Sequence, residues 1–175
     1  MTNFRRVSEM NEAFGNPKGD PSNIERVRKQ CLNIVDELGE LFVALGADPE
    51  LLKGAVGHLK WVAGRQVYNT NLTDARDALC DIHVFTYGAH HLLGIDADTD
   101  MAAVIDGVMT RFIKDADDKQ ATIAMHASKG VADVYFEGEY PHMVMKSASD
   151  QPDAPKGKFL KSASYRDTVF PKVNA

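Results

Sequence analysis

A helical repeat of apolar residues between positions 24 and 45 constrains the fold more than any other feature of the sequence. Its members, spaced by three and four, are Ile24, Val27, Cys31, Ile34, Leu38, Phe42 and Leu45. This period places them on one face of an α-helix, and that face must be buried. At about 100° per residue, Glu37 and Glu40 point about 60° apart and away from the apolar stripe. Two carboxylates therefore share the opposite face of the predicted helix.

A second acidic cluster lies on the helix predicted from Thr73 to about Leu93. Asp74, Asp77 and Asp81 are spaced at i, i+3 and i+7, which keeps them within about 60° of one another. If the two helices pack side by side, their carboxylates repel unless they are protonated or hold a cation. Mg²⁺ takes oxygen ligands from carboxylates and from substrate phosphates. The pattern therefore predicts a magnesium site between two helices.

Each acidic cluster also has a simpler interpretation, because Asp and Glu opposite an apolar stripe are typical of a solvated helix face. Asp74 has a further one, since an acid in the first turn complements the helix macrodipole. Asp36, Glu37 and Glu40 have no Lys or Arg at i+3 or i+4. Like charges at that spacing destabilise a helix by a few tenths of a kcal/mol. We expect a bound cation to offset this cost.

Composition narrows the class of protein. The 175 residues suit one domain, and the net charge of -5 comes with no long run of Lys or Arg, so duplex nucleic acid is not an expected partner. No stretch reaches the length of a membrane span, and no apolar core follows the first six residues. Cys31 and Cys80 are too few for a disulfide framework. We expect a cytoplasmic protein with reduced thiols.

The rest of the chain predicts an all-α core followed by a small β element. Further helices are expected over 4–14, from Pro49 after an Asp48 cap to about 68, from Thr99 to about 113, and over 119–128. Residues 131–137 and 140–146 flank a Gly-Glu pair and predict a β-hairpin. The polar tail beyond it is expected to be extended. The predicted organisation is a helical domain over 1–130, with the hairpin and tail of 131–175 packed on it.

Two motifs carry a resemblance to a known family. Residues 36–40 (Asp-Glu-Leu-Gly-Glu) followed by 77–82 (Asp-Ala-Leu-Cys-Asp-Ile) resemble the Glu-x-x-Glu and Glu-x-x-Asp motifs of the all-α nucleoside triphosphate pyrophosphohydrolases. These include MazG-like proteins, dimeric dUTPase and phosphoribosyl-ATP pyrophosphohydrolase. Residues 13–15, 87–96, 114 and 157–161 near Tyr165 look similar to the phage-encoded and phosphoribosyl-ATP-pyrophosphohydrolase-like branches. The sequence departs from the family pattern in two ways. The interval between the two motifs is longer than usual, and the residue three positions before Asp81 is Ala78, not an acid. Asp74 and Asp77 form a rival alignment for the second motif.

The resemblance implies a helical bundle of the all-α NTP pyrophosphatase type and a reaction. The enzyme would hydrolyse a nucleotide between its α- and β-phosphates, releasing a monophosphate and pyrophosphate. The cofactor would be Mg²⁺, with Mn²⁺ as a substitute, and Asp36 and Glu37 would be catalytic, Asp36 by holding or activating the attacking water. The implied metal ligands are Glu37, Glu40, Asp77 and Asp81.

The resemblance also implies substrate contacts and partners. Lys114, Lys158 and Lys161 would neutralise phosphate charge, and Tyr165 would stack on a base. The alternative for Lys158 and Lys161 is a solvated tail, and the alternative for Tyr165 is simple packing. The phage-like tail favours a (d)NTP such as dGTP or dATP, with dUTP or phosphoribosyl-ATP as alternatives. A homodimer or homotetramer is expected, in the host cytoplasm if the protein is phage-encoded. A non-catalytic helical scaffold or regulator is the alternative from another class.

Overall fold

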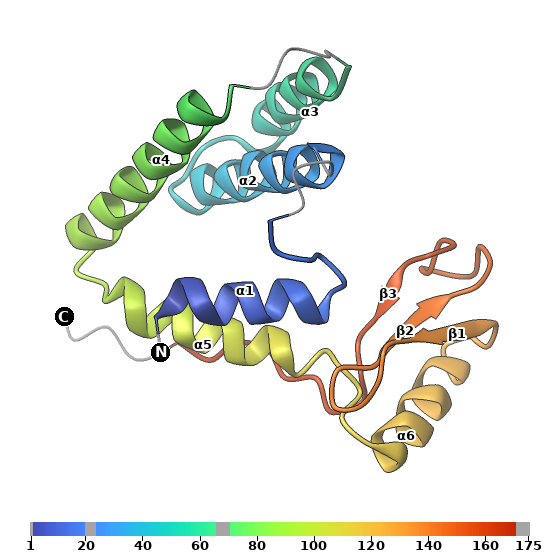
Figure 1. The fold of residues 1–175 in the computed structure, drawn as a ribbon. Helices are drawn as coiled ribbons and strands as arrows, with labels where there is room; N and C mark the ends of the chain where they lie inside the picture. Colours follow the sequence, from blue (N-terminus) through green and yellow to red (C-terminus); the bar gives the residue numbers. More distant parts are fainter. Residues whose placement is uncertain (1, 20–23, 66–70, 171–175) are drawn as a thin grey trace. The chain divides into compact units, whose positions relative to one another are not determined.

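The structure is a computed structural model that describes residues 2–19, 24–65 and 71–170. Its elements are α1 (Asn3–Ala13), α2 (Ile24–Ala44), α3 (Pro49–Arg65), α4 (Leu72–Leu92), α5 (Ala97–Met109), α6 (Ala116–Ala127), β1 (Val134–Glu137), β2 (Val144–Ser147) and β3 (Phe159–Leu160) (Figure 1). The described chain is therefore mostly helical with a small antiparallel sheet near its C-terminal end. The predicted all-α core with a C-terminal β element is confirmed at this level.

The chain divides into two compact units. One, the sheet unit, combines Met1–Asn16 with Asp81–Ala175; the other, the helix-pair unit, is Pro17–Cys80. The division falls inside α4, which differs from the expected boundary at residue 130. The β element packs with α6, which precedes it, and with Phe14 at the end of α1.

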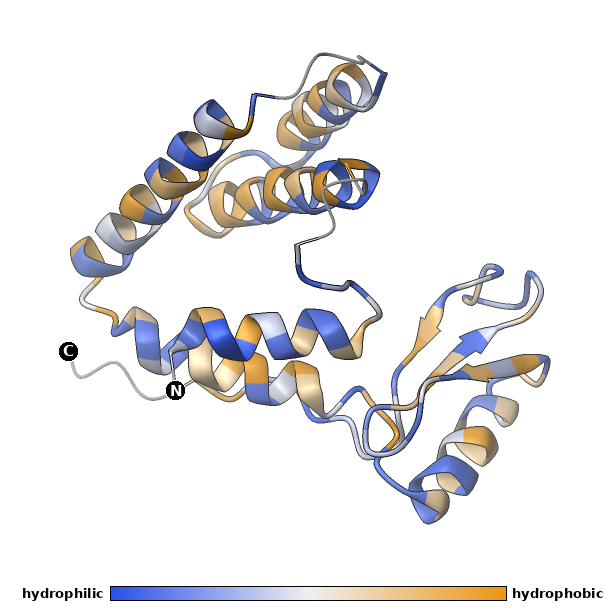
Figure 2. Ribbon diagram, in the orientation of Figure 1, coloured by the Kyte–Doolittle hydropathy of each residue, from blue (hydrophilic) through white to orange (hydrophobic). Residues whose placement is uncertain are grey.

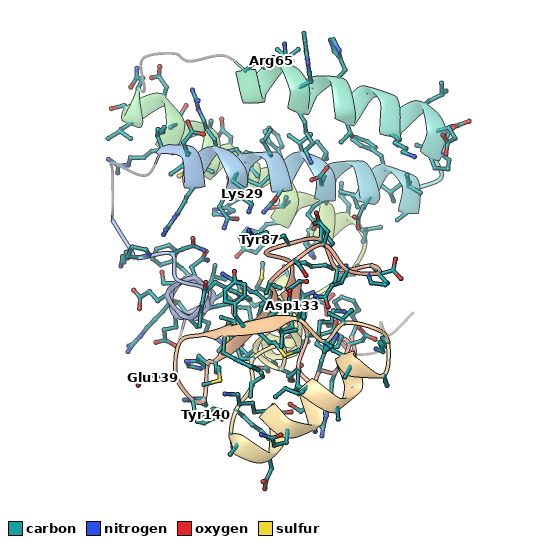
Figure 3. All side chains as sticks on the ribbon, turned by 90° about the vertical axis from the view of Figure 1, so that its right-hand side faces the viewer. Lys29, Arg65, Tyr87, Asp133, Glu139 and Tyr140 are labelled. Atoms are coloured by element: carbon teal, nitrogen blue, oxygen red, sulfur yellow. The ribbon has the colours of Figure 1, made fainter. Side chains whose placement is uncertain are left out.

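In the helix-pair unit, α2 and α3 lie side by side (Figure 1). Asp48 caps α3 as expected, because its Oδ1 accepts from the backbone N–H groups of Glu50 at 2.9 Å and Leu51 at 3.1 Å. At the end of α2, Gly46 adopts a φ of +96°, which favours glycine. Arg65, labelled in Figure 3, lies over the Trp61 ring in the last turn of α3. The expected end of α3 near 68 lies outside the described residues.

The structure begins α4 and α5 before Thr73 and Thr99, the residues from which these helices were predicted. Asn71, not Thr73, caps α4, because Asn71 Oδ1 accepts from the backbone N–H of Thr73 at 3.1 Å. Asp96 caps α5, and its Oδ1 accepts from the backbone N–H of Thr99 at 3.2 Å. This backbone hydrogen bond, helped by the Thr99 side chain, lowers the pKa of Asp96. In both helices the cap is an Asn or Asp whose side-chain oxygen accepts from backbone N–H groups, and the helix begins earlier than predicted.

The sheet confirms the hairpin and adds a strand. β1 and β2 are antiparallel, with Val134 opposite Ser147 and Glu137 opposite Val144. Glu139 and Tyr140 lie in the loop that joins the two strands (Figure 3). The sequence predicts no strand in the tail, but residues 159–160 form β3 and pair with β2. That prediction was wrong because the partner of this short strand lies outside its own neighbourhood in sequence.

The core of the sheet unit gathers around this sheet. Its buried members are Ile113, Val131, Met145, Ala154 and Leu160. Ile123 of α6 packs against them, which holds that helix on the sheet. At the end of α1, Phe14 meets the rings of Phe112 and Phe159 at centroid distances of 4.6 Å and 5.6 Å. The N-terminal helix is thereby tied to the C-terminal strands.

The apolar stripes of α2, α3 and α4 are not covered. Within the described parts of these helices only Gly39 is buried. Figure 2 shows apolar residues along all of them, and Phe42, Trp61 and Phe85 are 47%, 55% and 75% exposed. Among the residues that the structure describes, no helix is long and apolar enough to cross a membrane.

Candidate metal and nucleotide site

The acidic residues of α2 line a groove between α2 and α3. The groove has a volume of about 690 Å³, and Asp36, Glu37 and Glu40 form its acidic wall. The wall contributed by α3 carries Lys53, together with apolar residues such as Val56. The groove therefore combines carboxylate oxygens with an ammonium group from the facing helix.

Gly39 sets the spacing of the two helices at this groove. A Cβ placed on Gly39 would lie 2.9 Å from Val56 Cγ2, which is closer than side chains pack. Because Gly39 sits between Glu37 and Glu40, the close approach brings the acidic turn of α2 directly against α3. The sequence identified Gly39 as part of the motif, but its contact with Val56 follows from the fold.

Asp36 has a basic partner that its own helix does not supply. Lys60 of α3 donates from Nζ to Asp36 Oδ2, and the two side chains are 34% and 40% exposed. The like-charge cost at Asp36 is thus offset by a lysine, so this residue does not require a bound cation. Sequence spacing can reveal a basic partner only on the same helix. It could not reveal Lys60, because this ion pair joins α3 to α2.

Glu37 and Glu40 are exposed and unpaired. Neither accepts a hydrogen bond or forms an ion pair within the described ranges. Their spacing of three places them one turn apart on the groove side of α2. These two residues keep the full set of carboxylate oxygens that a hard cation needs.

The acids of α4 are placed differently. Asp74 Oδ2 accepts from Asn71 Nδ2 at 2.7 Å, which places Asp74 in the first turn of α4 beside the cap and favours its interaction with the helix macrodipole over a metal role. Asp77 and Asp81 are exposed on the same helix, on either side of the division between the two units. Among the described residues, no three His, Cys, Asp or Glu side chains lie close enough to hold a metal. The structure thus groups the α2 acids and describes no grouping of them with those of α4.

The predicted phosphate-binding residues lie in the sheet unit, and some of them are neighbours. Lys161 Nζ lies 3.8 Å from the centre of the Tyr165 ring. The backbone N–H groups of Lys114 and Ser164 both donate to the Asp118 carboxylate, each at 3.2 Å. One buried carboxylate therefore joins the Lys114 segment to the residue before Tyr165.

The structure differs from the sequence-based expectation at Lys158, which was predicted as a phosphate contact, and at Arg111, which was not. Lys158 donates from Nζ to the backbone oxygen of Asp153, so its ammonium is already engaged. Arg111 was not predicted as a binding residue, yet its guanidinium carbon lies 5.7 Å from the centre of the Tyr165 ring. The only sequence signal for Arg111 is its position three residues before Lys114. Its proximity to Tyr165 depends on a contact across more than 50 residues of sequence.

Comparison with known proteins adds no assignment, because no protein-family model, curated protein or solved structure matches the chain. The chemistry of the site must therefore be judged from its own residues. Unpaired carboxylates in an open groove are ligands for hard divalent cations, whereas Arg and Lys beside an aromatic ring suit phosphates and bases.

Proposed function

We propose that this chain is a Mg²⁺-dependent nucleotide pyrophosphohydrolase that cleaves a (d)NTP to a monophosphate and pyrophosphate. The observation that carries the proposal is the pair Glu37 and Glu40, whose carboxylates lie one turn apart in the α2–α3 groove and have no partner among the described residues. The resemblance of residues 36–40 and 77–82 to paired acidic motifs supports the same reaction. dGTP and dATP are the favoured substrates.

The residues fit a magnesium ion. Mg²⁺ is commonly bound by one or two carboxylates together with waters and substrate phosphates, so Glu37 and Glu40 form a sufficient donor set. Both are exposed, so no buried charge has to be desolvated. Asp77 and Asp81 are the proposed further ligands from α4. When bound, the ion would neutralise phosphate charge and lower the pKa of a water molecule.

The other polar residues have distinct proposed roles. Asp36 is oriented by Lys60 through Oδ2, and Oδ1 has no described donor, which leaves it available to accept a proton from the attacking water. Lys53 lines the same groove and would attract phosphate oxygens. In the sheet unit, Lys114, Lys158, Lys161 and Tyr165 are the proposed substrate contacts, and Lys158 would use the ammonium protons that its bond to Asp153 O leaves free.

A homodimer or homotetramer is part of the proposal. Among the described residues of α2, α3 and α4 only Gly39 is buried, while side chains such as Phe42 and Leu38 remain nearly half exposed. Helices with such stripes gain stability when a second copy covers them, as in symmetric helical bundles. Sedimentation of the purified protein should give a mass of two or four chains.

The activity is tested by incubating the protein with each dNTP, with dUTP and with phosphoribosyl-ATP, in Mg²⁺, Mn²⁺ or EDTA. The products are separated by ion-exchange chromatography. Monophosphate and pyrophosphate from a purine dNTP, formed with the metals and absent with EDTA, are the expected result. Turnover of dUTP or phosphoribosyl-ATP alone would replace the substrate assignment. Absence of turnover with every nucleotide would reject the enzyme and favour the helical scaffold.

A further inference from the structure

Two cations meet at one aromatic ring in the sheet unit. Lys161 Nζ and Arg111 Cζ lie 3.8 Å and 5.7 Å from the centre of the Tyr165 ring. Both positive charges are therefore concentrated around one side chain, and Lys161 is exposed. Within the described ranges no carboxylate forms an ion pair with either of them. An anion beside this ring would be attracted by both charges.

Arg111 carries a polar atom that the described chain does not satisfy. Its Nε is shielded from solvent and has no hydrogen-bond partner among the described residues. An anion arriving from solvent does not reach this shielded atom, so it can contact only the remaining part of the guanidinium. The side chain as a whole is only half-buried, so an anion can reach the outer edge of the guanidinium. The planar guanidinium matches the oxygens of a phosphate at that edge.

The backbone around these side chains is held in place. The backbone N–H of Ser162 donates to Arg111 O at 3.1 Å, and Ser162 Oγ donates to Thr110 O at 2.9 Å. Arg166 N donates to Thr110 Oγ1 at 2.9 Å, which fixes the segment on the other side of Tyr165. Because the site is ordered before a ligand arrives, binding does not have to order it.

The nearby acids are engaged elsewhere. Asp118 is buried and accepts from the backbone N–H groups of Lys114 and Ser164 and from Ser164 Oγ. Asp167 accepts from the Tyr165 hydroxyl at 2.6 Å, and Asp115 caps α6 by accepting from the backbone N–H of Asp118. Within the described part of the chain, these contacts leave Arg111 and Lys161 as charges of the cluster without a carboxylate partner.

We infer that Arg111 and Lys161, arranged around Tyr165, bind the polyphosphate chain of a nucleotide or free pyrophosphate. This inference rests on the proposed function for its choice of ligand, and it adds Arg111 as the residue that grips the phosphates. Arg111 supplies a planar fork of donors, and Lys161 supplies a mobile point charge. The site belongs to the sheet unit, and its geometry does not depend on the acids of α2.

The test is calorimetric titration of the full chain with pyrophosphate, dATP and orthophosphate at low salt in the presence of EDTA. The variants are Arg111→Met, Lys161→Met and the charge-conserving Arg111→Lys. Lys156→Met is the matched control, because Lys156 is an exposed lysine of the same tail. Loss of a charge-assisted phosphate contact should weaken pyrophosphate binding about tenfold or more in the two test variants. Binding by Lys156→Met should stay within about twofold of the wild type, and Arg111→Lys should fall in between.

The inference is overturned if the unaltered protein binds no pyrophosphate, or if Arg111→Met and Lys161→Met bind it as Lys156→Met does. Lys161 is exposed, so its variant keeps the test valid even if Arg111→Met unfolds. Tighter binding of dATP than of pyrophosphate assigns the site to nucleotides, and equal binding assigns it to the free polyphosphate. Because EDTA prevents metal-dependent turnover, the titration tests only phosphate binding by Arg111 and Lys161. Its outcome is therefore independent of the hydrolysis assay, which tests the proposed enzyme.

Discussion

Gly39 of α2 faces Val56 of α3 so closely that a Cβ on Gly39 would lie 2.9 Å from Val56 Cγ2. The glycine between the two candidate ligands Glu37 and Glu40 is therefore the contact that determines how α2 and α3 approach each other. The groove and the packing of the helix pair depend on the same small residue.

Gly39→Ala should lower the free energy of unfolding by about 1 kcal/mol, because overlap with Val56 outweighs the gain in helix propensity. In the Val56→Ala background the overlap is absent, so the same substitution should be stabilising. Urea unfolding of the two single variants and the double variant measures this reversal. If Gly39→Ala has the same effect in both backgrounds, the close contact is not present in solution.

Glu40→Gln and Glu37→Gln should each reduce Mg²⁺-dependent hydrolysis about 100-fold or more. Mutating a residue that only hydrogen-bonds to a metal ligand often lowers activity about 10- to 100-fold, and we expect the loss of a ligand itself to cost at least as much. Stability should change by less than about 0.5 kcal/mol, since both side chains are exposed and have no partner among the described residues. Glu12→Gln on α1, another exposed glutamate, is the control and should keep full activity. Turnover by Glu40→Gln at the rate of this control would remove Glu40 from the metal site.

The ion pair of Asp36 and Lys60 should make only a small contribution to stability. Both side chains are about a third or more exposed, so a double-mutant cycle with Asp36→Asn and Lys60→Met should give a coupling energy below about 1 kcal/mol. Raising the salt concentration should reduce it further. A coupling energy that is large and insensitive to salt would show that this pair is desolvated in the assembled protein.

Asp118→Asn should destabilise the protein by about 3 kcal/mol. Both oxygens of the buried carboxylate accept hydrogen bonds, and the NH₂ group of asparagine would face the N–H and O–H donors that one of these oxygens now accepts from. Asp117→Asn changes an exposed carboxyl in the same helical turn and should cost less than about 1 kcal/mol. Thermal unfolding of both variants gives the comparison. Equal losses would mean that the carboxylate of Asp118 does not join the Lys114 and Ser164 segments.

The parts of the fold that the sequence predicted are those governed by local interactions. The apolar period over 24–45 corresponds to α2 at Ile24–Ala44, and the Asp48-Pro49 pair begins α3. The hairpin follows from its strand residues and its turn. β3 could not be predicted because two residues carry no period, and their strand character comes from pairing with β2.

The candidate site shows the same division. The spacing of Glu37 and Glu40 is enough to place both on one helix face. The partner of Asp36 and the position of Arg111 beside Tyr165 could not be predicted, because each joins segments that are distant in sequence.

The amino-acid sequence alone settled which segments are helical and which carboxylates share a helix face, because both follow from the 3.6-residue period of the α-helix. Three-dimensional packing was needed to establish that Gly39 brings α2 against α3, that Lys60 pairs with Asp36, and that Arg111 and Lys161 meet at Tyr165. Such contacts join residues that are distant along the chain, so they have no signature in local spacing.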